Sequence, residues 1–162
     1  MKPIGSADSP LAAGKTFGQG DFVAIYVDGQ LFGIPVLAIR DVLGPQRVTR
    51  IPLAPPEVAG ALNLRGRIVT AIDVRRRLGL PARADGGRDM SVVVECGGEL
   101  YSLIVDSVAE VLTLAPEGYE RNPGTLNPRW REISAGIYRL DGQLMVMLDV
   151  DNLLRFQHTA AA

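Results

Sequence analysis

Short runs of hydrophobic, β-prone residues separated by glycine-containing turns recur along the chain. Residues 22–27 are followed by Asp28-Gly29, a dipeptide that tolerates positive φ and favours a tight hairpin, and then by a second run at 31–34. The same order of run, turn and run is found twice more, and one further strand is predicted. These segments are 91–96 with 100–105, 137–140 with 144–148, and 68–72. Many short strands with few long helical periods predict an all-β barrel or sandwich.

The two halves of the chain resemble each other. Residues 22–43 align with 92–112, so that Phe32 matches Tyr101, and residues 66–78 align with 142–154, so that Asp73 matches Asp149. So long a repeat that occurs only twice does not make a solenoid. We therefore predict two small related barrels packed together, from a pseudo-repeat near residues 22–80 and 90–156.

The domain boundaries follow from composition. Residues 1–20 are rich in Gly, Ser, Pro and Ala and lack periodicity, which predicts a mobile N-terminal tail. Residues 157–162 form a C-terminal tail in the same prediction. One folded domain is then expected over residues 21–156, with its two lobes joined by the glycine-containing, charged stretch 81–89.

The predicted strands at 68–72 and 144–148 carry apolar side chains on both faces. A strand with one wet face alternates hydrophobic and polar residues, so these strands are expected to be covered on both sides, by their own barrel and by the other lobe. Each lobe alone would be marginal in size, whereas a shared core would stabilise both. The lobes are therefore predicted to unfold together.

Rare residue types limit the chemistry that the chain can perform. Among 162 residues the only His is His158, the only Cys is Cys96 and the only Lys are Lys2 and Lys15. This composition argues against a multi-histidine metal site, a Ser-His-Asp triad and an internal disulfide, so we expect no catalytic residue, metal or cofactor. Cys96 is predicted to be packing material.

The overall charge and hydropathy give no sign of a nucleic-acid or membrane partner. Seventeen Lys and Arg residues against 18 Asp and Glu leave a formal net charge of −1. That balance provides no global field that would hold an anionic polymer or surface. No hydrophobic run has the length of a signal-peptide core or a membrane span, so a soluble cytoplasmic protein without direct membrane insertion is expected.

The matched Asp73 and Asp149 could be paired carboxylates for acid and base catalysis. Each, however, follows a predicted strand and precedes a short helical turn, where a carboxylate caps backbone N–H groups. We therefore predict two helix N-caps. Residues Arg75 to Arg77 then fall in the last turn before Gly79, where cations suit the helix dipole, although a nucleic-acid patch is the alternative reading.

The segment 58–67 has a different character. If it is extended, Asn63 and Arg65 point to the same exposed face, beside the permissive Gly66. A guanidinium next to an amide suits recognition of a partner carboxylate. The alternative is an internal ion pair of Arg65 with Asp41 or Asp106.

Several motifs together resemble the CheW family of bacterial chemotaxis coupling proteins. They are Asn63-Leu64-Arg65-Gly66-Arg67-Ile68-Val69, Ile72-Asp73-Val74-Arg75, Leu78-Gly79-Leu80, Phe32-Gly33-Ile34, Ile39-Arg40-Asp41-Val42, Val48-Thr49-Arg50-Ile51-Pro52 and Ile104-Val105-Asp106. The resemblance covers residues 20 to 156. It implies two intertwined five-stranded SH3-like barrels with a shared core and short helical turns.

The resemblance also implies a function. Members of this family are non-catalytic adaptors that bridge the regulatory domain of a CheA-type histidine kinase to the cytoplasmic tip of methyl-accepting chemoreceptors. The chain is then expected in the cytoplasm, recruited to membrane-associated receptor arrays. The open alternatives are the same adaptor role in a non-motility chemosensory pathway, a nucleic-acid-binding barrel, and an enzyme, for which we find no constellation of residues.

Carried over by motif, the partner-binding residues are Ile39, Asp41, Val42, Gly60, Asn63, Arg65 and Val105. The receptor is expected to dock as a helix in a groove, with Arg65 fixing its register by charge. The chain departs from the family at Ser107, where a glycine is frequent, and in the loop 116–131, which contains Trp130.

Overall fold

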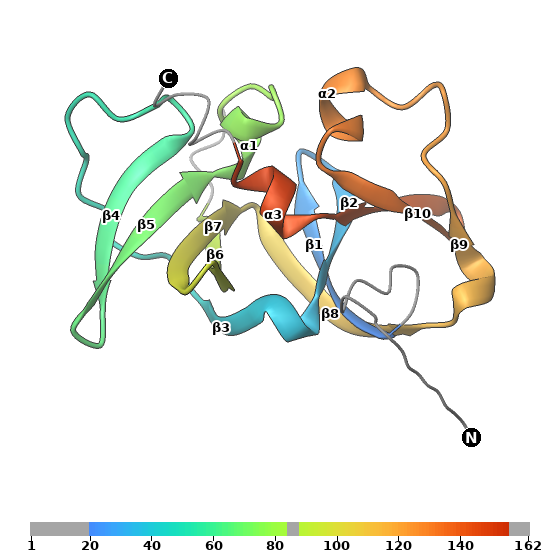
Figure 1. Ribbon diagram of the computed structural model, residues 1–162, viewed down its shortest axis with the longest axis horizontal. Helices are drawn as coiled ribbons and strands as arrows, with labels where there is room; N and C mark the ends of the chain where they lie inside the picture. The colour runs from blue at the N-terminus through green and yellow to red at the C-terminus, as the bar shows by residue number, and fades with distance from the viewer. Residues whose placement is uncertain (1–19, 84–87, 156–162) are drawn as a thin grey trace.

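The computed structural model describes residues 20–83 and 88–155, which form strands joined by hairpin turns and short helical segments (Figure 1). The elements in chain order are β1 (Gly20–Val27), β2 (Gln30–Pro35), η2 (Val36–Ala38), β3 (Ile39–Leu43), β4 (Val58–Leu64), β5 (Arg67–Asp73), α1 (Val74–Arg77), β6 (Met90–Cys96), β7 (Glu99–Val105), β8 (Ser107–Leu114), η3 (Pro116–Gly118), β9 (Tyr119–Glu120), α2 (Pro128–Arg131), β10 (Ser134–Leu140), β11 (Gln143–Leu148) and α3 (Val150–Leu153). The predicted all-β class is confirmed.

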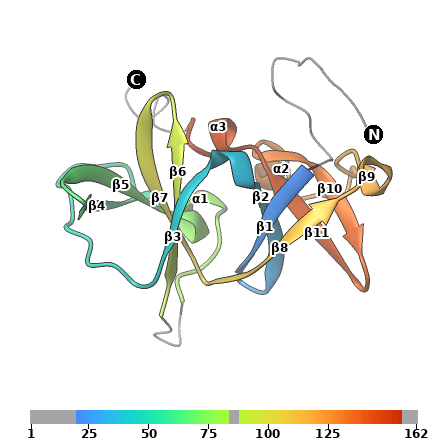
Figure 2. The ribbon, with the colours of Figure 1, turned by 90° about the horizontal axis from the view of Figure 1, so that it is seen from below.

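Two sheets define two lobes that lie side by side (Figure 2). The sheet of lobe A has the strand order β8-β1-β2-β11-β10-β9, and the sheet of lobe B has the order β3-β6-β7-β5-β4. The short strand β9 gives lobe A six strands, one more than the five predicted. In both sheets all neighbouring strands are antiparallel except one central parallel pair, β2 with β11 and β7 with β5.

The sequence repeat is visible in this topology, but the lobes are not the two halves of the chain. Lobe A takes β1 and β2 from the first half and its other strands from the second, whereas lobe B takes β6 and β7 from the second half and its other strands from the first. The register obeys the repeat, since Phe32 pairs with Val146 in lobe A as Tyr101 pairs with Thr70 in lobe B. The two repeats are therefore intertwined through exchanged strands.

The predicted hairpins form where glycine-containing turns place them. Asp28 and Gly29 have φ of 52° and 78°, which allows a two-residue turn between β1 and β2. The β6–β7 hairpin closes in the same way at Gly97 and Gly98, with φ of 61° and 82°, whereas in the Asp141-Gly142 turn of the β10–β11 hairpin only Gly142 has positive φ, of 79°. Positive φ costs glycine little and aspartate less than most residues, which is why the local sequence was sufficient to predict these turns.

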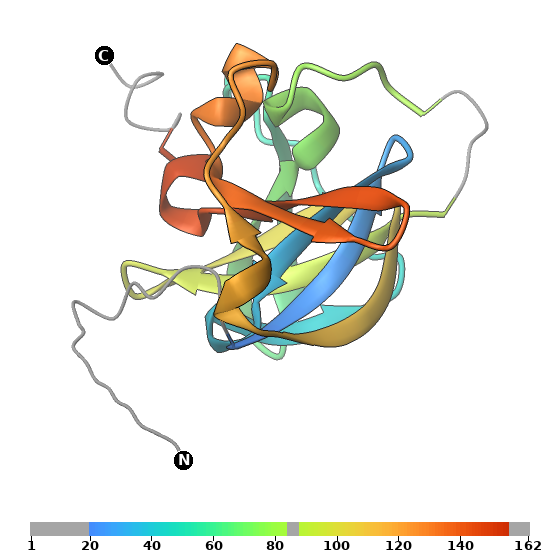
Figure 3. The ribbon, with the colours of Figure 1, turned by 90° about the vertical axis from the view of Figure 1, so that its right-hand side faces the viewer.

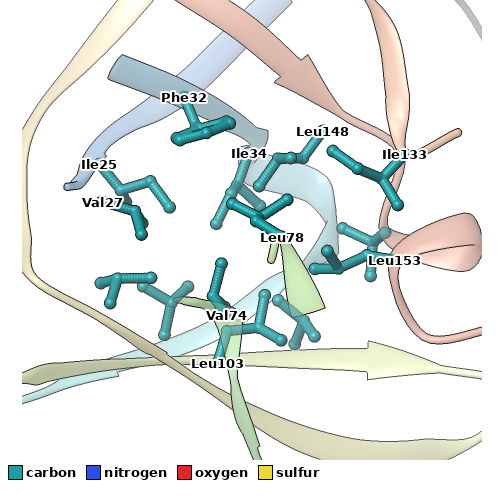
Figure 4. Close-up of a cluster of buried hydrophobic side chains, with 14 of the residues drawn as sticks. Ile25, Val27, Phe32, Ile34, Val74, Leu78, Leu103, Ile133, Leu148 and Leu153 are labelled. Atoms are coloured by element: carbon teal, nitrogen blue, oxygen red, sulfur yellow. The ribbon is translucent and has the colours of Figure 1, made fainter. Parts of the chain in front are cut away.

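The largest hydrophobic cluster lies between the lobes and draws on both (Figure 4). Ile25, Phe32 and Leu148 from lobe A pack there with Leu103 from lobe B and Leu78 after α1, all fully buried. Two smaller clusters fill the individual barrels, one around Met145 and Met147 and the other around Leu62 and Val69. The predicted shared core is thus present, alongside a core for each lobe.

The strands at 68–72 and 144–148 are covered on both faces, as predicted, except at Ile68. Val69 and Met147 lie in the clusters of the single lobes, and Ile72 and Leu148 lie in the shared cluster. Residues 68–72 were expected to be covered on both faces, yet Ile68 is 72% exposed, whereas Val69 and Ile72 are fully buried. Ile68 lies one residue after the start of β5, next to the β4–β5 turn, where the hairpin extends beyond the two cores. The apolar pattern alone did not reveal that this end of the strand is solvent-exposed.

Both matched aspartates are helix N-caps, as predicted. The Asp73 carboxylate accepts a hydrogen bond from the Arg76 backbone N–H at the start of α1, and the Asp149 carboxylate accepts one from the Asn152 backbone N–H at the start of α3. Gly79 follows α1 with φ of 76°, as a C-terminal glycine should. The duplicated position thus has a duplicated structural role.

Arg75 joins the two lobes on one side of the molecule. Its Nε and Nη2 atoms donate to Oδ1 and Oδ2 of Asp106 at 2.9 and 2.6 Å, and the Asp28 backbone N–H donates to Oδ2 of the same carboxylate at 2.8 Å. Asp106 lies between β7 and β8, Arg75 lies in α1, and Asp28 belongs to the β1–β2 turn. This cluster ties a hairpin of lobe A to a helix of lobe B.

The loop that departs from the family also contributes to the contact between lobes. Trp130 in α2 donates from Nε1 to the backbone carbonyl of Leu78 at 3.0 Å, and its ring packs edge-on against Phe32 with centroids 5.4 Å apart. Figure 3 shows α2 and α1 on the same side of the molecule. The residues 116–131 therefore have a structural role that the sequence analysis did not anticipate.

The predicted tails lie outside the described residues, apart from Gly20, which begins β1, and residues 84–87 of the predicted joint also lie outside them. In the ranges 20–83 and 88–155, no helix has the length and hydropathy to cross a membrane.

Candidate partner-binding surface

Arg65 lies in the turn between β4 and β5 rather than on an extended strand, so the expectation for this residue is corrected. Arg65 and Gly66 have φ of 51° and 85°, the pattern of a two-residue hairpin turn with both residues left-handed. The Asn63 side-chain Oδ1 accepts a hydrogen bond from the Gly66 backbone N–H at 2.9 Å. Asn63 thus stabilises the turn that presents Arg65.

The Arg65 guanidinium is paired within the protein. Its Nη2 atom lies 2.9 Å from Oδ2 of Asp41, which was one of the two internal partners considered. The Arg65 side chain is nevertheless 74% exposed, whereas that of Asp41 is 25% exposed. A partner could therefore reach the guanidinium while Asp41 holds it in place.

The remaining predicted residues fall into an exposed and a buried group. Val42 on β3 is exposed next to Asp41, and Ile39 on the same strand is half-buried against the shared core. Val105 is buried in that core, so its side chain is not available to a partner in this conformation. The structure thus joins Asp41 to Arg65 and places Asn63 in the same hairpin as Arg65, whereas the side chain of Val42, next to Asp41 on β3, alternates to the other face of the strand and Val105 lies inside.

Gly60 is buried, and close packing of the backbone explains why this position holds a glycine. It has φ of 150°, and a Cβ atom there would collide with the Thr49 carbonyl oxygen. Thr49 and Ala61 exchange two backbone hydrogen bonds of 2.8 Å beside it. A side chain at position 60 would therefore disturb the loop that closes lobe B.

Ile68 extends the surface and was missed as a site residue. It pairs with Asn63 across the β4–β5 hairpin and is largely exposed. Its position two residues after Gly66, at the tip of a hairpin, was the signal that could have identified it. We call the group Asp41, Asn63, Arg65 and Ile68 the Asp41–Arg65 surface.

The arginine run at 75–77 does not form a free basic patch. Arg75 binds the Asp106 carboxylate, and Arg77 donates to the backbone carbonyls of Leu153 and Asn152 at the end of α3 at 2.7 and 3.0 Å. The Arg75 hydrogen bonds hold the pKa of Asp106 below its ordinary value. Two of the three guanidiniums are thus engaged in contacts that hold the fold together.

A separate pocket of about 810 Å³ lies between the β6–β7 turn and α3. Its lining is mixed, with Glu99, Tyr101 and Leu154 among the residues, and it contains none of the predicted site residues. Cys96 lines it and is half-buried, with Sγ 3.2 Å from Oδ1 of Asp151, so it is less completely packed than a core cysteine. Within the described ranges, no group of three or more His, Cys, Asp or Glu side chains could hold a metal ion.

Comparison with known proteins identifies the family. Residues 21–158 match the CheW-like domain. A chemotaxis protein CheW of Rhizobium meliloti (strain 1021) is 26% identical over 147 residues, which are 91% of this chain and 95% of that protein. A chemotaxis protein CheW of Klebsiella aerogenes is 28% identical over 156 residues, which are 96% of this chain and 93% of that protein.

A solved structure supports the same conclusion. The crystal structure of the scaffolding protein TtCheW from Thermoanaerobacter tengcongensis superposes with a TM-score of 0.73 at 26% identity, covering 81% of this chain and 89% of that one. The match extends through both lobes, so the resemblance predicted from the motifs is confirmed. The chain belongs to the CheW-like domain family of chemotaxis scaffold proteins.

Proposed function

We propose that the protein is a non-catalytic adaptor that couples methyl-accepting chemoreceptors to the regulatory domain of a CheA-type histidine kinase. The observation that carries this proposal is the family match over residues 21–158, which spans both lobes and leaves no additional domain to supply another activity within that range. The two relatives compared above are named as chemotaxis proteins, and the match covers nearly the full length of each.

The Asp41–Arg65 surface is the part of the molecule that we assign to receptor binding. Arg65 stands at the tip of a hairpin with its charge accessible, Ile68 adds exposed apolar area on the same hairpin, and Val42 adds exposed apolar area on β3. A receptor helix could bury its apolar stripe against these side chains while a carboxylate on that helix pairs with Arg65. The charge would fix the register and the apolar contact would supply most of the affinity.

Coupling of this kind requires no chemistry by the adaptor. A receptor that changes its helix positions alters the relative stability of the kinase arrangements that it can support. The adaptor transmits that difference only to the extent that its contacts differ between the two states. In this proposal the protein works in the cytoplasm and is recruited to membrane-associated receptor arrays by its two partners.

Reconstitution tests the proposal directly. Purified protein is mixed with a CheA-type kinase and a receptor cytoplasmic fragment, and kinase autophosphorylation is measured with and without each component. We expect the kinase to become receptor-dependent only when the protein is present. Kinase autophosphorylation that responds to the receptor fragment equally with and without the protein would contradict the adaptor role. Co-purification of the receptors and kinase from cells then separates a motility pathway from another chemosensory pathway.

A further inference from the structure

Leu53, in the loop between β3 and β4, combines an unfavourable backbone with a fully exposed side chain. Its φ is 63°, and its side chain is among the most exposed large hydrophobic groups of the described residues. The other non-glycine residues with positive φ, Asp28 and Arg65, each precede a glycine in a two-residue hairpin turn. Leu53 lies in a turn in which the Ala54 backbone N–H donates to the Ile51 carbonyl at 3.3 Å.

This conformation is one that leucine normally avoids. Left-handed φ brings Cβ close to the backbone carbonyl, and glycine or asparagine is favoured at the third position of a turn with this geometry. Because the Leu53 side chain is fully exposed, no contact within the described part of the chain compensates for the strain. A residue that strains the backbone and whose side chain is fully exposed points to a contact with another molecule.

The loop holds Leu53 in a fixed place. Pro52 precedes it and Pro55 and Pro56 follow it, so three residues around it have restricted φ. Backbone hydrogen bonds anchor both ends of the segment, from Thr49 to Ala61 at 2.8 Å and from Val58 to Pro55 at 2.9 Å. A leucine presented in this way loses little conformational entropy when a partner covers it.

The charge of the same loop is basic and unneutralised. Arg47 and Arg50 are both exposed, and within residues 20–83 and 88–155 neither side chain takes part in an ion pair or hydrogen bond. The loop's one acidic residue, Glu57, lies near Arg77 instead. By contrast Arg40, Arg65 and Arg139 each pair with a carboxylate.

We propose that the loop 47–53 docks an acidic amphipathic helix of a partner protein. Leu53 and the exposed Ile51 would enter the apolar stripe of that helix, and Arg47 and Arg50 would pair with carboxylates along its flanks. A leucine that is held in one position suits a shaped site on a partner protein, whereas binding to a fluid lipid surface gains nothing from a fixed side chain. The contact uses none of the residues of the Asp41–Arg65 surface and does not depend on the adaptor role.

Fluorescence anisotropy with a labelled peptide tests the proposal. The probe is an 18-residue amphipathic helix with Leu along one face and Glu on its flanks, titrated with the full chain. We expect saturable binding that Leu53→Asn weakens at least five-fold and that the double change Arg47→Glu and Arg50→Glu abolishes. The matched control Leu37→Asn alters a leucine that is 90% exposed on η2 and should leave binding unchanged.

Three binding outcomes would overturn the proposal. They are equal binding of a peptide with Lys in place of Glu, equal binding by Leu53→Asn, and binding of phosphatidylserine vesicles that Leu53→Asn removes while the peptide does not bind. Thermal denaturation supplies an independent readout. Because asparagine tolerates positive φ, Leu53→Asn should raise Tm even as it weakens peptide binding. A lower Tm would show that Leu53 stabilises the fold itself and would contradict the inference.

Discussion

The guanidinium of Arg65 lies 2.9 Å from the carboxylate of Asp41, and this contact joins the β4–β5 turn to β3, which stand at opposite edges of the lobe B sheet. Exposed ion pairs of this kind contribute about 0–1 kcal/mol. A partner carboxylate could therefore share or replace Asp41 at little cost. Asp41 holds Arg65 in position without blocking it.

Removing this guanidinium should weaken receptor binding and leave folding intact. We expect Arg65→Ala to reduce affinity for a receptor cytoplasmic fragment roughly ten-fold, since charge-assisted hydrogen bonds contribute about 1.5–3 kcal/mol. Binding is measured by pull-down and calorimetry, and the fold by thermal denaturation.

Arg139→Ala is the matched control, because Arg139 is also exposed and paired, with Glu120 at 2.7 Å, but lies in lobe A. It should bind the receptor as the unmodified protein does. Equal affinity for Arg65→Ala and the unmodified protein would remove Arg65 from the proposed surface.

The shared core should make the two lobes unfold as one unit. Leu103 belongs to lobe B and packs in the cluster that also contains Phe32 and Leu148 of lobe A. We expect Leu103→Ala to lower the free energy of unfolding by about 2–5 kcal/mol and to shift one calorimetric transition rather than split it. Two resolved transitions, with only one of them moved, would mean that the lobes are independent.

Acid should weaken the contact between Asp106 and Arg75. The pKa of Asp106 is lowered in the folded state, chiefly by its hydrogen bonds with Arg75, from an ordinary value of 3.8. The stabilisation is therefore fully present above about pH 4 and is lost as the pH falls through the folded pKa. Urea denaturation from pH 7 to pH 3 measures it.

We expect Asp106→Asn to be less stable than the unmodified protein by about 2 kcal/mol at pH 7, with the difference shrinking below pH 4. The exposed Glu110 provides a control, and Glu110→Gln should follow the pH profile of the unmodified protein. A difference for Asp106→Asn that stays constant with pH would show that the charge of Asp106 is not responsible.

The two N-caps should contribute similar amounts to stability. Asp73→Ala and Asp149→Ala are each expected to lower the free energy of unfolding by about 1 kcal/mol, because each leaves a backbone N–H without its carboxylate acceptor. Asparagine at either position should recover most of the loss. If the alanine and asparagine variants lower the free energy of unfolding equally, the carboxylate acts through its charge rather than as a cap.

Local patterns predicted the hairpins and the N-caps, because each depends on residues close together in sequence, and comparing the two halves of the chain predicted the repeat. Asp28-Gly29 specifies a turn, and the Asp73 cap needs only the three residues that follow. The exchange of strands between lobes depends instead on which hairpin packs beside which, as in the parallel pairing of β2 with β11. No run of residues along the chain encodes that choice locally.

The site was predicted less completely than the fold. The motif identified Arg65 and Asp41, but arginine seldom adopts positive φ, so propensity placed Arg65 on the strand instead of in the turn. Val105 was chosen by family likeness and lies in the core. The role of Trp130 was missed, because its contact with Leu78 joins residues 52 positions apart and leaves no local pattern in the sequence.

The exchanged strands also determine when the molecule can fold during its synthesis. In lobe A, β11 stands between β2 and β10, yet it is made after every other strand. The β1–β2 hairpin, translated first, must wait for its central neighbour until nearly the whole chain has been translated. All strands of the lobe B sheet are available once β7 has been made, so lobe B can pair its strands earlier in synthesis, whereas lobe A and the shared core can be completed only after β11.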